Sequence, residues 1–183
     1  MACGRFLLVL LIALAFPASG IAGTAASSGA AGSAASASVT RDTSLEELLL
    51  REINALRGNR GLTRLTHSTL LSRSAAGHSR AMATYGFFTH ESRNGAAFSQ
   101  RIKQFYAQRS GLWSVGENLA MFGGAQPTAS AIVAAWMGSP GHRANLLRGV
   151  FREAGVGVMF NPAAGGVFGG QSTWVVTLDL GRR

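Results

Sequence analysis

Two stretches near the C-terminal end alternate between apolar and small or polar residues, and they constrain the fold most. In residues 154–160, Gly155 and Gly157 fall on the face opposite the valines, and residues 174–180 alternate again. A period of two is typical of β-strands. Glycines on one face of a strand let another element approach the backbone closely. The two runs predict an antiparallel pair at the centre of a sheet, joined by a glycine-rich loop from residue 161 to about 171.

The preceding chain has the apolar spacing of helices. Ser44-x-x-Glu47 reads as a capping box that starts a first helix, which ends at the run 57–61. A second helix starts near Ser68 and ends at Gly86. Further helices are predicted at 98–105, after Pro127, and after Ser139, while 116–120 follows a loop with Glu117 partly exposed.

The N-terminal region predicts export. Residues 1–20 combine one arginine, a short apolar run and small residues suited to cleavage, as in a secretory signal peptide. An uncleaved anchor is the alternative, and it is the only membrane contact we expect. Residues 21–40 are nearly all Ala, Ser, Gly and Thr, which is typical of a disordered linker. Residues 41–183 then form one domain, in a protein that is secreted, periplasmic or held at the cell envelope.

Charge and cysteine content narrow the possible partners. The formal net charge is +9, nearly all from arginine. The arginines are scattered without a basic run or a nucleic-acid-binding module, so we expect no nucleic-acid partner. A basic surface also suits anionic envelope polymers or lipid head groups. The only cysteine is Cys3, inside the signal segment, so the exported chain has no disulfide, thiolate nucleophile or cysteine zinc ligand.

The stretch from Ser139 to Leu147 carries the first candidate site residue. Ser139 can cap a helix with its hydroxyl, and Pro140 suits the first helical position. His142 then lies in the first turn, where the helix dipole favours the neutral ring. A neutral imidazole can bind metal or accept a proton. Two other stretches, 87–90 and 115–118, carry polar groups that can meet it.

A second histidine, His78, has the sequence environment of a core residue. His78 falls on the apolar stripe of the second helix, together with Leu71, Ala75, Met82 and Tyr85. We therefore predict a hydrogen-bonded core histidine there and no role in a site.

The chain resembles the CAP superfamily (cysteine-rich secretory proteins, antigen 5 and pathogenesis-related 1 proteins), in its cysteine-free bacterial branch. The resemblance covers residues 45–181. Its signatures occur in order along the chain: Asn54-x-x-Arg57 with Gly61-Leu62-x-x-Leu65, Ala75-x-x-His78-Ser79-x-x-Met82-Ala83, Phe87-Phe88-Thr89-His90, Gly116-Glu117-Asn118-Leu119-Ala120, Trp136-Met137-x-Ser139-Pro140-Gly141-His142-Arg143-x-Asn145-Leu146-Leu147, and Gly155-Val156-Gly157-Val158.

This resemblance implies an α/β fold, a three-layer α-β-α sandwich around a mainly antiparallel sheet. It also implies a central cleft that in some members binds zinc, and the matching residues are His90, Glu117 and His142. The flanking positions of the same signatures are expected to support the cleft, namely Ser139, Asn118, Arg143 and Asn145. The second glutamate of the eukaryotic pattern is missing, because Met137-Gly138-Ser139 stands there. Zinc would then be held by two histidines, one glutamate and a water.

Three functions remain open for this cleft. A metal-assisted hydrolase of peptide or envelope polymer is one, although Glu91 is directed to the opposite face and no nucleophile elbow surrounds Ser79 or Ser139. A binding module is another, with a small apolar ligand such as a lipid or sterol, an envelope component or a protein as its partner. A purely structural hydrogen-bond network is the third. We expect a non-enzymatic binding module with no catalytic residues, because the second glutamate and a separate base are absent.

Overall fold

A computed structural model describes residues 38–109 and 111–183. The predicted signal peptide and linker residues 21–37 lie outside the described residues. The helices are α1 (Thr43–Gly58), α2 (Thr69–Tyr85), α3 (Phe98–Phe105), α4 (Ala129–Gly138) and α5 (Pro140–Leu146). The strands are β1 (Thr40–Arg41), β2 (Thr66–His67), β3 (Ser114–Gly123), β4 (Glu153–Ala164) and β5 (Gln171–Arg182), with a short 3-10 helix, η1 (Gly166–Phe168), before β5.

The sheet is mainly antiparallel, with the order β1-β4-β5-β3. β5 lies in the middle and pairs antiparallel with both β4 and β3. β2 pairs with β4 in parallel, beyond the short β1 ladder. The predicted antiparallel pair is therefore confirmed as β4 and β5. Both strands are longer than predicted. β4 continues through a bulge between Asn161 and Ala164, and β5 begins at Gln171, so the expected loop is shorter.

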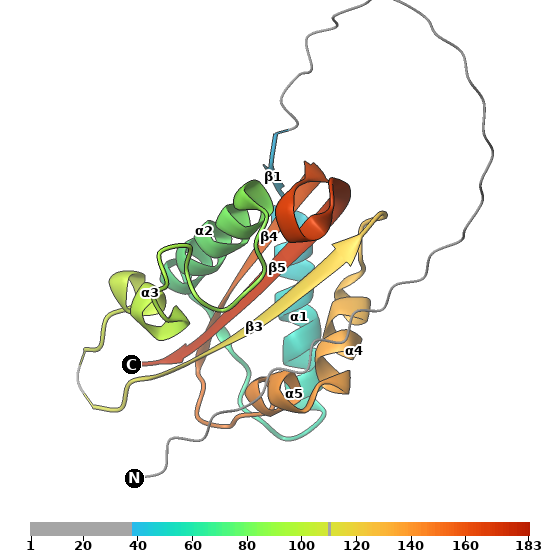
Figure 1. The fold of residues 1–183 in the computed structure, drawn as a ribbon. Coiled ribbons are helices and arrows are strands. Elements are labelled where there is room, and N and C mark those ends of the chain that lie inside the picture. Colours follow the sequence, from blue (N-terminus) through green and yellow to red (C-terminus); the bar gives the residue numbers. More distant parts are fainter. Residues whose placement is uncertain (1–37, 110) are drawn as a thin grey trace, which may run out of the picture. The chain divides into compact units, whose positions relative to one another are not determined.

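Helices cover both faces of this sheet (Figure 1). α2 and α3 pack on one face, and α1, α4 and α5 pack on the other. The larger apolar core lies on the second face, where the buried side chains include Leu45, Leu49, Ile53, Ile132, Val133, Trp136, Leu146, Val156, Val158, Val176, Leu178 and Leu180. The expected three-layer α-β-α arrangement is the observed one.

The glycines of β4 explain how close α2 lies to the sheet. A Cβ atom added at Gly157 would lie 2.3 Å from the backbone N of Ala76 in α2. At Gly155 it would lie 2.0 Å from the backbone N of Ser72. Real carbon atoms do not approach backbone nitrogen so closely. The close approach predicted for this glycine face is therefore made by the backbone of α2.

Local signals set most helix ends, with two corrections. Ser68 caps α2, and α2 ends at Gly86, whose φ of 70° is in the left-handed region that glycine adopts readily. The predicted capping box at Ser44 is wrong, because the N-cap of α1 is Asp42, whose side chain accepts from Leu45 N at 2.9 Å. Ser139 is the N-cap residue of α5 with Pro140 following, but its hydroxyl makes no capping hydrogen bond.

Two further findings bear on the site. Strand β3 has no counterpart in the sequence prediction, and Glu117 on it is 3% exposed, so it is buried where we expected partial exposure. Strand β1 includes Thr40, which the predicted boundary places in the linker. None of the helices in the described part of the chain combines the length and apolar character that a membrane crossing requires.

Candidate functional site

The segment after α2 positions the first cleft histidine. The chain leaves α2 at Gly86 and runs through residues 87–91 to a turn at Gly95. His78, inside α2, holds this segment: its Nε2 lies 2.9 Å from the carbonyl oxygen of Thr89, next to His90. His78 is 2% exposed, so the predicted hydrogen-bonded core histidine is confirmed. Burial is the main cause that lowers the pKa of His78 to about 4, which keeps the ring neutral near pH 7.

Glu117 meets two donors at once. Nδ1 of His90 lies 2.8 Å from its Oε1, and because a carboxylate oxygen accepts, Nδ1 donates. Nη2 of Arg101 forms an ion pair with Oε2. Nη1 of the same arginine donates to the carbonyl oxygen of His90 at 3.0 Å and to Ser92 Oγ at 3.1 Å. Both carboxylate oxygens of Glu117 are therefore engaged.

Two asparagines join α5 to β3. Asn145 Nδ2 donates to the carbonyl oxygen of Glu117 at 3.0 Å and lies 2.9 Å from Asn118 Oδ1. Asn118 Nδ2 donates to the carbonyl oxygen of His142 at 3.0 Å. These bonds hold the first turn of α5 against the strand that carries Glu117. The structure thus brings His90 and Glu117 into contact and ties the His142 backbone to the residue after Glu117.

His142 is half-buried, and its pKa is lowered by burial first and by the neighbouring His90 second. The direction agrees with the predicted neutral ring, and its causes are burial and the neighbouring His90. A neutral, partly accessible imidazole is suited to hydrogen bonding, proton acceptance or metal binding.

Ser139 and Arg143 contribute less than the asparagines. Arg143 is exposed, and its Nη1 bonds the carbonyl oxygen of Met137 at the end of α4, at 3.4 Å. The backbone carbonyl of Ser139 accepts from Arg143 N at 2.9 Å within α5. Their predicted support of the cleft stays a prediction.

Two charged residues next to the cleft were missed by sequence reasoning. Arg101 lies on α3, and Asp179 lies on β5 directly opposite Glu117 in the β3–β5 register. Asp179 is fully buried, and burial together with Glu117 raises its pKa well above the ordinary value. A signal existed for each: an aspartate inside the apolar run 174–180, and an arginine beside Ile102 on the apolar side of a short helix.

The arrangement does not fit a zinc ion as it stands. Zinc needs three or four ligands at bonding distance. Glu117 already binds Arg101 and His90, which leaves the two imidazoles. Across residues 38–109 and 111–183, no group of three or more His, Cys, Asp or Glu side chains is placed to hold a metal ion. The zinc site stays a prediction, and zinc at Glu117 would compete with the bonds from Arg101 and His90.

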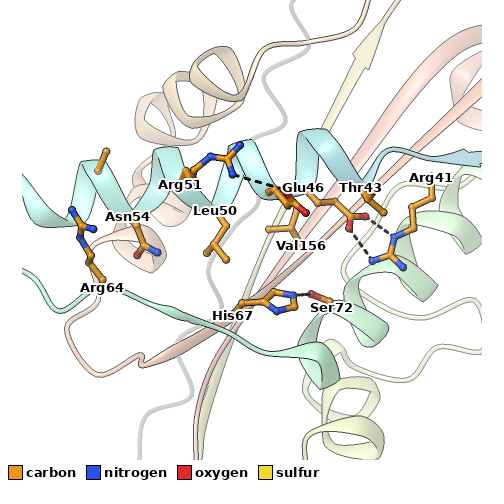
Figure 2. Close-up of a pocket in the computed structure, with 12 residues that line it drawn as sticks. Arg41, Thr43, Glu46, Leu50, Arg51, Asn54, Arg64, His67, Ser72 and Val156 are labelled. Carbon is orange, nitrogen blue, oxygen red and sulfur yellow. Dashed lines mark hydrogen bonds and ion pairs between the residues drawn. The ribbon is translucent and has the colours of Figure 1, made fainter.

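A groove lies elsewhere, under α1 at the β2 edge of the sheet (Figure 2). It has a volume of about 690 Å³ and is lined by Arg41, Thr43, Glu46, Glu47, Leu50, Arg51, Asn54, Ala55, Arg64, His67, Ser72 and Val156. His67 Nε2 bonds Ser72 Oγ there at 2.9 Å. This groove shares no side chain with the cleft of His90, Glu117 and His142.

Residues 50–178 match the cysteine-rich secretory protein family, CAP. The chain belongs to this family. It is 33% identical over 115 residues to the "Uncharacterized protein YkwD" of Bacillus subtilis, covering 63% of this chain and 42% of that protein. It is 30% identical over 116 residues to the "Uncharacterized membrane protein YlbC" of the same organism, covering 63% and 32%. This CAP domain thus spans less than half the length of these curated relatives.

Solved structures agree with the fold. An extracellular protein of Bacillus anthracis that contains an SCP domain matches with a TM-score of 0.59 and 25% identity, over 77% of this chain and 41% of that chain. An outer surface protein of Borrelia burgdorferi matches with a TM-score of 0.62 and 23% identity, over 79% and 98%. The second likeness shows a shared fold alone.

Proposed function

We propose that this CAP-family protein is an exported, non-catalytic binding module that binds an anionic component of the cell envelope. The predicted signal peptide supports export. The similar Bacillus anthracis protein is described as extracellular, and one Bacillus subtilis relative is described as a membrane protein. Both descriptions suit a role at the envelope or outside the cell.

The observation that carries the binding proposal is a basic face formed by α2, α3 and the segments around them. We use "basic face" for five exposed cations, Arg73, Arg80, Arg93, Lys103 and Arg109. Across residues 69–109 the single acidic residue is Glu91. A surface with one sign of charge attracts polyanions and raises their association rate.

Neighbouring groups hold parts of this basic face in place. The guanidinium of Arg93 stacks 4.0 Å from the ring centre of Tyr85, and that of Arg73 lies 5.8 Å from the ring centre of Phe105. Nη1 of Arg80 donates to the carbonyl oxygen of Val39 at 3.0 Å. Side chains that are already ordered lose less entropy when they bind a partner.

The cleft contacts support a role without catalysis. Ser79 is fully buried, and its hydroxyl bonds Gly157 O at 2.9 Å and Thr177 Oγ1 at 2.8 Å. The carboxylate of Glu117 is engaged by His90 and Arg101. The carboxylate of Glu91 accepts from the Thr89 hydroxyl on an exposed segment. The remaining candidates for a general base are the imidazoles of the cleft.

A co-sedimentation experiment tests the binding proposal. Cell-wall sacculi that carry a phosphate polymer are compared with the same sacculi after that polymer is removed. Binding should need the polymer and should weaken as salt rises from low to physiological concentration, because ions screen exposed charges. Arg73→Glu/Arg80→Glu/Lys103→Glu should lower the affinity by about tenfold or more.

The matched control is Arg51→Glu/Arg60→Glu/Arg64→Glu, which changes the net charge equally but lies in α1 and in the segment after it. Equal losses in the two triple variants would mean that net charge alone drives binding. Binding to stripped sacculi would contradict the proposal of an anionic partner.

The hydrolase alternative is favoured by one observation, the neutral and partly accessible ring of His142. A panel of peptide and glycan substrates, assayed with and without chelator, tests it. We expect no turnover above that of His142→Ala. Chelator-sensitive turnover that His142→Ala abolishes would replace the binding proposal with a metal-assisted hydrolase.

A lipid or sterol ligand has less support. Phe87 and Phe88, which could line an apolar pocket, pack against the core between α2 and the sheet. Their ring contacts are with His78, at 6.0 Å between centroids, and with Phe168, at 6.4 Å. A lipid adduct in native mass spectra of the exported protein would be the result that favours such a ligand.

A further inference from the structure

Arg101 is a charged side chain that lies almost wholly inside the protein. It is 8% exposed and reaches from α3 toward β3. Nη2 of its guanidinium pairs with Glu117. Nη1 donates to the carbonyl oxygen of His90 and to the hydroxyl of Ser92. A single guanidinium therefore joins the acidic residue of the cleft to the backbone of the segment that carries His90.

The positive charge of Arg101 faces two buried carboxyl groups. Glu117 and Asp179 are register partners on β3 and β5, with exposures of 3% and 0%. Within the described residues neither carboxyl oxygen of Asp179 has a hydrogen-bond partner, and Ser74 Oγ on α2 also lacks one. An uncompensated buried carboxylate is costly. Arg101 forms an ion pair with Glu117, one member of this carboxyl pair.

An imidazole also contacts this pair. His90 contacts Glu117 through Nδ1. The guanidinium of Arg101 supplies the fixed positive charge of this cluster.

We propose that Arg101 is the resident cation of the cleft and that it excludes a divalent metal from His90, Glu117 and His142. A zinc ion at Glu117 would compete with the ion pair to Arg101 and with the bond from His90 for the two carboxylate oxygens. It would also place two further positive charges beside the guanidinium in a poorly solvated site, where like charges repel strongly. The protein's own side chain thus engages the carboxylate that the family resemblance assigns to zinc.

Zinc titration of the full exported chain, purified without chelator, tests this inference. Native mass spectrometry counts bound zinc, and calorimetry gives the affinity. The unmodified protein should bind zinc no more tightly than His142→Ala does. Arg101→Met should gain at least about tenfold in zinc affinity, because Glu117 then has a free oxygen. A second change, His142→Ala, should remove that gain.

The matched control is Arg41→Met. Arg41 donates to both carboxylate oxygens of Glu46 at 2.8 Å, so this variant also frees a largely buried glutamate. Among the described residues no histidine forms a hydrogen bond or ion pair with Glu46, and His67 of the same groove bonds Ser72 instead, so Arg41→Met should not gain zinc affinity.

A second variant and a spectroscopic readout keep the test decisive if Arg101→Met does not fold. Arg101→Gln removes the charge but keeps an amide that can donate to His90 O. In the unmodified protein, the ring resonances of His90 and His142 should not shift on adding equimolar zinc. Zinc binding through these rings with Arg101 intact would overturn the inference. So would the absence of any gain in both Arg101 variants.

Discussion

Two histidines of this chain differ in what their surroundings do to their charge. His78 lies on α2 and is buried under the segment that follows this helix. Its Nε2–H donates to the backbone carbonyl of Thr89, and a carbonyl can only accept. His90 is partly accessible and donates to a carboxylate. The first is a fixed structural group, and the second belongs to a charged cluster that a ligand or ion can perturb.

The lowered pKa of His78 makes stability depend on pH. Between the ordinary value of 6.5 and about 4, the unfolded chain binds a proton that the folded chain does not, so stability falls as the pH falls. The effect amounts to roughly 3 kcal/mol in full. His78→Gln should remove this part of the pH dependence, measured by urea unfolding at pH 7 and pH 5. His67→Gln, at an exposed histidine, should follow the unmodified protein. Equal slopes for His78→Gln and the unmodified chain would contradict the assignment.

At the scale of elements, side chains of α4 and α5 close the outer edge of β3. Asn145 Nδ2 donates to the carbonyl of Glu117, and Trp136 Nε1 donates to the carbonyl of Leu119 at 2.8 Å. These carbonyls are two residues apart, so they point in the same direction, away from β5. The side chains of Trp136 and Asn145 therefore give hydrogen-bond donors to the backbone carbonyls of an edge strand. Both residues also attach their helices to that strand.

The contact between α2 and β4 gives a prediction at the same scale. Gly157→Ala should destabilise the fold by about 3 kcal/mol or more, because a new Cβ would overlap the backbone of Ala76 and α2 cannot shift without losing its other contacts. Gly77→Ala is the control, since Gly77 is an exposed position of α2 where a Cβ would meet nothing within 4 Å. It should stabilise the protein by about 1 kcal/mol. Thermal and urea unfolding measure both changes. A mild effect of Gly157→Ala would mean that α2 sits less rigidly on the sheet.

Local patterns explain which elements could be predicted. α2 is bounded by a serine cap and a glycine, and its apolar stripe needs no knowledge of distant residues. β3 was missed because Gly116, Glu117 and Asn118 interrupt its apolar character. Those residues are buried only because β5, α3 and α5 supply their partners. The same reason hid Arg101 and Asp179, since single-sequence reasoning places isolated charges at the surface.

In the domain as a whole, the exposed basic residues and the larger apolar core lie in different layers. The layer of α2 and α3 carries the basic face, and the opposite layer of α1, α4 and α5 carries the larger apolar core and His142. The cluster of His90, Glu117 and His142 joins both layers across β3, because His90 and Arg101 come from one side and α5 from the other. This explains why the ordered family signatures indicated the cleft residues while the spacing of any one signature did not.

The other edge of the sheet, along β4, is covered in two pieces. β1 pairs near Phe160 and β2 pairs near Glu153, and the carboxylate of Glu46 accepts the N–H of Val158 between them at 3.0 Å. β1 leads directly into α1, and β2 follows α1 after a short connection. Detachment of α1 would therefore uncover these parts of the edge together, and unpaired strand edges can pair with another molecule. The first helix thus helps to keep the β4 edge covered.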